Sequence, residues 1–161
     1  MAITNDSAIA DTWKHATNTS RLISLGFYDG TTSGLIELET EVVFRYDVVS
    51  WDDHQDRRVY CLARMPAPAF DELVKLMSPL ETPHWPQWFP RWVFSSDIER
   101  SVDKILDQAG PYSVVGLGTD VTAIDDALGL EAQSYDKAQE FRRTGQRQPF
   151  NDWLPLFGVK Q

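Results

Sequence analysis

An acidic turn between two expected strands holds the residue types that bind metal ions or transfer protons. Three carboxylates and one imidazole lie within five residues: Asp52, Asp53, His54 and Asp56. Together they could bind a divalent ion, or pair a general base with an orienting acid. Their spacing matches neither the calcium-binding loop nor a helical histidine pair. Because aspartates also favour hairpin turns, the segment predicts either turn chemistry or the site of a small metal-dependent or hydrolytic enzyme.

A second candidate site is a proline-broken aromatic loop at residues 81–94. Its tryptophans are Trp85, Trp88 and Trp92. Indole rings offer a large, rigid area with one polar atom, so these three could form a platform for a peptide or a sugar. The alternative is that they cover the open face of the sheet, because six tryptophans in 161 residues must mostly be buried.

A third candidate is an acidic ridge, which we define as Glu99, Asp103 and Asp107. Their spacing of four residues aligns the carboxylates along one side of an expected helix. Like charges at this spacing destabilise a helix by about 0.2–0.5 kcal/mol per pair. The ridge could dock a basic protein, because complementary fields raise association rates. It could also be an ordinary solvated helix face.

Two further patterns indicate structure rather than chemistry. Gly116 and Gly118 resemble the start of a phosphate-binding loop, but Val121 stands where the third glycine belongs, so we expect a turn. Cys61 lies inside an expected strand without a nearby histidine to lower its pKa, so we expect a buried structural thiol.

The residues that must position these candidates begin with a β-meander. Between residues 21 and 66, apolar runs rich in β-branched and aromatic residues alternate with polar turns. They predict four strands, at residues 22–28, 35–38, 42–49 and 59–62. Residues 112–117 could add a fifth strand to the sheet.

Helical spacing dominates the rest of the chain. Apolar residues three and four apart predict a helix at residues 70–77, and Ser96 with Glu99 fits a capping box that opens a helix ending before Gly110. Residues 121–128 and 134–141 suggest two more helices, and residues 1–20 are expected to be loosely ordered.

Composition limits the class of protein. The chain has 161 residues, 42% of them hydrophobic, which suits one domain covering residues 1–161. Its formal charge is −9, from 24 acidic and 15 basic residues, so nucleic acid and anionic membranes are unfavourable partners. A single cysteine, the lack of a secretion signal and the lack of a membrane-spanning stretch predict a cytoplasmic protein.

We therefore expect an α+β fold. A four- to five-stranded, mainly antiparallel sheet from the N-terminal half would be covered on one face by helices of the C-terminal half. The charge and the acidic ridge favour a non-enzymatic interaction or inhibitor-type protein that binds a basic partner without a cofactor. The alternatives are the enzyme at residues 52–56 and the ligand-binding module at residues 85–92.

Overall fold

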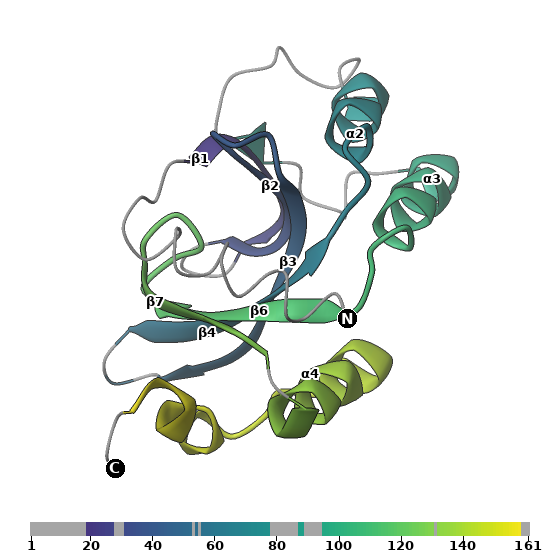
Figure 1. The fold of residues 1–161 in the computed structure, drawn as a ribbon. Helices are drawn as coiled ribbons and strands as arrows, with labels where there is room; N and C mark the ends of the chain where they lie inside the picture. Colours follow the sequence, from purple (N-terminus) through teal and green to yellow (C-terminus); the bar gives the residue numbers. More distant parts are fainter. Residues whose placement is uncertain are drawn as a thin grey trace. The chain divides into compact units, whose positions relative to one another are not determined.

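The computed structural model describes residues 19–27, 31–52, 54, 56–77, 87–88, 95–130 and 132–158 (Figure 1). The chain divides into two compact units. Unit 1 comprises Met1–Thr17, Asp47–Leu62 and Pro111–Gln161, and unit 2 comprises Asn18–Tyr46 and Ala63–Gly110. The expectation of one domain stays a prediction.

The sheet confirms the α+β class but has more strands than expected. The described strands are β1 (Thr19–Phe27), β2 (Thr31–Leu38), β3 (Val43–Asp52), β4 (Arg57–Arg64), β5 (Gln87–Trp88), β6 (Tyr112–Gly118) and β7 (Ile124–Gly129). Their hydrogen-bonded order is β5-β1-β2-β3-β4-β6-β7. Six form an antiparallel sheet, and the two-residue β5 adds to β1 in parallel. The expected count of four or five strands was therefore wrong.

The sixth strand comes from a segment expected to be helical. Residues 121–128 have helical spacing of apolar residues, but β7 pairs antiparallel with β6. A Cβ at Gly118 would lie 2.2 Å from the carbonyl oxygen of Ala123, so only glycine admits this close hairpin. The pairing skips Asp125, because Leu117 faces Asp126 while Gly118 faces Ile124. Tertiary pairing thus prevails over local helical spacing.

Three helices lie where the sequence predicts helices, although the last of them extends beyond the predicted residues 134–141. They are α2 (Ala69–Met77), α3 (Ser96–Leu106) and α4 (Ala132–Thr144), and the short 3-10 helices η2 (Phe150–Asp152) and η3 (Leu154–Phe157) end the described chain. The cap of α3 is one residue earlier than expected, since the Ser95 side chain accepts a hydrogen bond from the Ile98 amide. Among the described residues, no helix is long and apolar enough to cross a membrane.

Unit 2 has its core between two helices and the meander. Buried residues of α2 and α3 pack on residues from β1, β2 and β3: Ile23, Leu25, Leu35, Val43, Phe70, Leu73, Met77, Val102, Ile105 and Leu106. Arg21 ties the layers together. Its guanidinium donates two hydrogen bonds of 2.8 Å to Glu37 and one of 2.7 Å to Asp71, and it lies 4.3 Å from the centre of the Phe70 ring. The sheet and α2 are thereby fixed together by a charge-assisted network.

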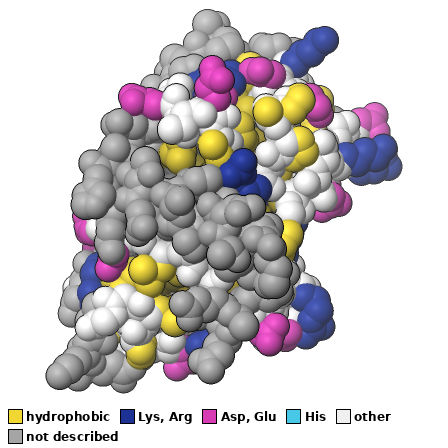
Figure 2. Space-filling view, in the orientation of Figure 1, with side chains coloured by type: hydrophobic (Ala, Val, Ile, Leu, Met, Phe, Trp, Pro, Cys, Tyr) yellow, Lys and Arg dark blue, Asp and Glu magenta, His cyan; other side chains and the backbone are white. Residues whose placement is uncertain are grey.

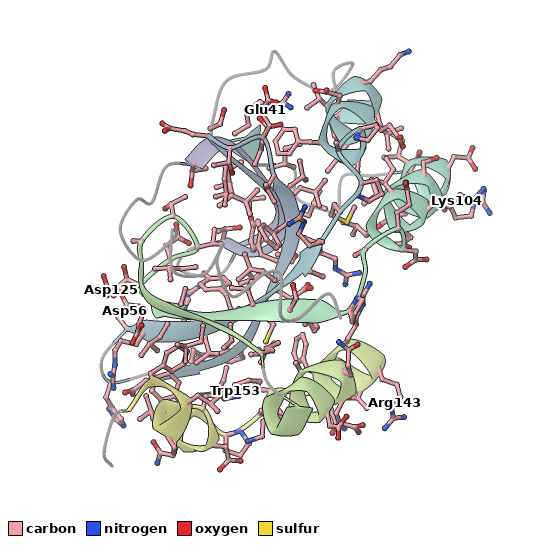
Figure 3. The ribbon with its side chains drawn as sticks, in the orientation of Figure 1. Glu41, Asp56, Lys104, Asp125, Arg143 and Trp153 are labelled. Atoms are coloured by element: carbon pink, nitrogen blue, oxygen red, sulfur yellow. The ribbon has the colours of Figure 1, made fainter. Side chains whose placement is uncertain are left out.

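In unit 1, α4 contacts β6, which is buried along its whole length. Arg142 of α4 lies over the ring of Tyr112, whose hydroxyl donates a 2.5 Å hydrogen bond to Asp47. Trp153 is fully buried and lies beside α4, where the Lys137 ammonium is 5.4 Å from its ring (Figure 3). The terminal aromatic segment therefore packs on its own chain. Whether the helices cover one face of the whole sheet stays a prediction.

A buried chain of hydroxyl groups lies beneath β2. The Thr31 hydroxyl donates to Ser24 Oγ at 2.5 Å and lies 2.6 Å from the Tyr46 hydroxyl, which donates to the Ile23 carbonyl at 3.1 Å. Gly34 lies next to this network and has φ of 153°. A Cβ there would lie 1.9 Å from the Ile23 oxygen and 2.9 Å from the Tyr46 hydroxyl. Any side chain at position 34 would have to break these contacts.

We predict that Gly34→Ala lowers the free energy of unfolding by about 3 kcal/mol, from backbone strain and lost buried hydrogen bonds. Gly145→Ala is the matched control, because Gly145 has φ of 69° but no atom within 4 Å of the place that a Cβ would occupy. It should cost only about 1 kcal/mol. Urea unfolding measures both, and equal losses would contradict the role given to close approach.

Candidate functional site

The β3–β4 turn brings together Asp52, His54 and Asp56. One carboxylate oxygen of Asp52 accepts a 3.0 Å hydrogen bond from the His54 amide, and the other lies 3.6 Å from the Arg57 guanidinium. The Asp56 amide donates to the Asp52 carbonyl at 3.1 Å. Asp56 has φ of 53°, a left-handed conformation that aspartate tolerates better than most residues. Each aspartate thus has a structural role in closing the hairpin.

This geometry favours turn chemistry over catalysis. Both carboxylate oxygens of Asp52 face partners within the turn, and the His54 side chain points into solvent as an exposed residue. Across the described ranges, no three His, Cys, Asp or Glu side chains are grouped to hold a metal ion. Asp53 lies outside the described residues, so the enzyme alternative stays a prediction.

The tryptophan platform is mostly beyond what the structure describes. Trp85 and Trp92 lie outside the described residues. Trp88 is described only through its backbone, which pairs with Ser24 in the parallel β5–β1 contact. The ligand-binding alternative therefore stays a prediction too.

The acidic ridge lies on α3, as its spacing predicts. Asp103 and Asp107 are exposed and Glu99 is half-buried, while Val102, Ile105 and Leu106 turn into the unit 2 core. Basic residues accompany the ridge: Arg100 forms an ion pair with Asp97, and Lys104 points outward (Figure 3). Figure 2 shows both charge signs over α2 and α3 on the viewed face. The ridge is therefore an acidic row within a mixed surface.

Helix electrostatics separate the acids of α3 into two groups. Asp97 and Glu99 lie in the first turn, where the positive end of the helix dipole favours carboxylates. Asp107 is instead the C-cap residue, where its carboxylate meets the negative end of the dipole. The helix dipole therefore favours Asp97 and Glu99 and disfavours Asp107.

Sequence reasoning missed a buried polar cluster in unit 1. Arg58 is 6% exposed, and its side chain hydrogen-bonds the hydroxyl of Tyr60, which donates to Asp120 at 3.3 Å. Burial, followed by the charge of Asp120, raises the pKa of Tyr60 well above its usual range. The hydroxyl of Thr122 also donates to Asp120, at 3.1 Å. Alternation along β4 could have suggested that Arg58 and Tyr60 share a face, but not that Asp120 meets them.

A second contact that the sequence does not signal joins Trp51 to the segment after α4. The Arg147 guanidinium lies 3.9 Å from the centre of the Trp51 ring and donates a hydrogen bond to the Trp51 carbonyl. These residues are 96 positions apart, and no local pattern links them. This contact places an arginine on the surface beside the β3–β4 turn.

Cys61 is a buried free thiol, as expected. Burial raises its pKa well above the usual value, and the nearby carboxylate of Asp47 raises the pKa further. The thiolate, which is the reactive form, is therefore disfavoured at neutral pH. Cys61 is a structural residue of β4.

Comparison of the chain with protein-family models, curated proteins and solved structures found no match. Any functional conclusion must therefore rest on the chemistry of the described residues.

We predict that Asp56→Gly raises the free energy of unfolding by about 0.5 kcal/mol, because glycine adopts the left-handed conformation without steric cost. Asp56→Val should lower it, since a β-branched residue is strained there. Urea unfolding compares both variants with the wild type. Destabilisation by Asp56→Gly would show that the carboxylate does more than fit the turn.

For Cys61 we predict that Ellman's reagent reacts with the native protein at pH 8 at least about a hundredfold more slowly than with the protein in urea. Because the pKa of Cys61 is raised, little thiolate is present at pH 8. Burial also keeps the reagent away from the sulfur. The absorbance of the released product gives both rates. Similar rates would mean that Cys61 is accessible in the folded state.

Proposed function

We propose that this chain is a non-enzymatic cytoplasmic binding protein whose acidic ridge docks a basic partner, as an inhibitor-type protein would. The observation that carries the proposal is the exposure of Asp103 and Asp107 on a helix whose other side is fixed in the core. A docking surface needs both properties. The core contacts hold the helix rigid, and exposure leaves the carboxylates within reach of a partner.

The energetic position of these acids supports binding rather than stability. Glu99, Asp103 and Asp107 repel one another along the helix, and Asp107 also opposes the dipole at the helix end. A partner that brings positive charge to the helix end would offset the cost of placing Asp107 there. A basic partner would do so, and long-range attraction to a chain of charge −9 would speed its association.

Unit 2 gives the ridge a firm base. Val102, Ile105 and Leu106 pack with α2 and the meander, and Asp107 is held at the helix end because its amide donates to the Asp103 carbonyl at 2.8 Å. The spacing of the carboxylates is therefore set before a partner arrives. Such preorganisation reduces the entropy lost on binding.

We predict that a Glu99→Lys, Asp103→Lys, Asp107→Lys variant loses a basic protein that the wild type captures from an extract of the source cell. The variant must first be shown to be folded by circular dichroism. The captured protein is identified by mass spectrometry and its stoichiometry measured by ultracentrifugation. Binding should weaken as salt rises from about 50 to about 500 mM, since exposed charges are screened over about 10 Å at 0.1 M salt.

The matched control is Glu39→Lys, Asp136→Lys, Asp152→Lys, which reverses three exposed acids elsewhere. Because each replacement adds two positive charges, both variants change the formal charge from −9 to −3. The control should retain the partner. Equal losses in both variants would mean that net charge alone drives binding, and no partner for the wild type would remove the proposal.

A further inference from the structure

Residues 145–149 lie against the end of β3, and we call them the strap. The Gln148 amide donates to the Val49 carbonyl at 3.2 Å, and the Ser50 hydroxyl donates to the Gln148 carbonyl at 2.5 Å. Arg147, between these contacts and α4, donates to the Trp51 carbonyl. The strap therefore contacts the main chain of β3 at Val49 and Trp51 and the side chain of Ser50.

The side chain of Arg147 contacts Trp51 of β3. Its guanidinium stacks on the half-buried Trp51 at 3.9 Å while it bonds the carbonyl of the same residue. The planar arginine fork suits both tasks at once, which a lysine ammonium would not. The surface under the strap is thus built to receive an arginine.

The strap lies on the surface, and the contacts that hold it are exposed or part-buried hydrogen bonds and one ring stack. Gly145, Gln146, Arg147 and Pro149 are exposed, and Gly145 is left-handed with nothing within 4 Å of where a Cβ would lie. Firm anchoring begins only outside it, at α4 on one side and at the buried residues Phe150 and Trp153 on the other. The strap can therefore lift from β3 without unfolding the segments that flank it.

We propose that the strap closes a binding site on β3 for an extended, arginine-containing segment of a basic partner. The partner's arginine replaces Arg147 on Trp51, and its backbone replaces Gln148 at Val49 and Ser50. The class of partner comes from the proposed function, but this surface belongs to unit 1 and is separate from the acidic ridge. Strap opening then limits the affinity, because a site open for a small part of the time binds correspondingly weakly.

The test uses a peptide with the sequence of the strap as the probe. A peptide of residues 144–149 with blocked ends is titrated into the wild type and into Arg147→Ala, and the indole N–H signal of Trp51 is followed by NMR after assignment with Trp51→Phe. The peptide should bind Arg147→Ala at least about tenfold more tightly than the wild type, since the competing arginine is gone. The same peptide with Arg147→Gln should bind neither protein.

Arg143→Ala is the matched control, because Arg143 is an exposed arginine that pairs with Glu140 on α4 (Figure 3). It should bind the peptide as the wild type does. Equal affinity of the wild type and Arg147→Ala, or an unchanged Trp51 signal at saturation, would overturn the proposal. So would a dimer of Arg147→Ala, since a second copy would then be the occupant. Peptide binding needs no natural partner, so a failed capture on the acidic ridge would leave this result standing.

Discussion

The phenol hydroxyl of Tyr46 is fully buried, and the meander of unit 2 is arranged around its need for hydrogen-bond partners. A buried hydroxyl without partners would cost about 1–3 kcal/mol. The Thr31 hydroxyl and the Ile23 carbonyl meet that need, and the Thr31 hydroxyl is in turn bonded to Ser24. They can do so only because β1 and β2 approach closely at Gly34, where no side chain stands between them. One polar group thus sets the pairing of two strands.

The meander was predictable because its information is local. β-Branched and aromatic runs bounded by turn residues locate the centres of β3 and β4, although both strands extend beyond the predicted residues 42–49 and 59–62. Apolar spacing likewise locates α2 and α3. Residues 121–128 were mispredicted because what decides their state is Gly118, whose missing side chain lets the chain fold back on β6. The sequence pattern shows the helical spacing of Val121, Ile124 and Leu128. It does not show that Gly118 leaves room for the chain to fold back.

The candidate sites divide in the same way. The acidic ridge is a property of one helix, so spacing alone located it, and the turn chemistry of Asp52 follows from the preference of aspartate for hairpins. The contacts of Arg147 with Trp51 and of Tyr60 with Asp120 join distant positions. No local pattern encodes such contacts, because they depend on which strands and loops become neighbours. Two of the three tryptophans of the expected platform lie outside the described residues, and the third is described by its backbone alone.

The skipped residue in β7 also bears on how copies of this protein meet. Asp125 is exposed and has no opposite residue on β6, and β7 is the last strand of the sheet in the described part of the chain. In an antiparallel pairing centred on this point, a second copy joining edge to edge would bring Asp125 and Asp126 against the same two acids, and the irregular backbone would misalign the hydrogen bonds. The β7 edge therefore disfavours pairing with a second copy. Exposed edge strands are where β proteins otherwise tend to aggregate.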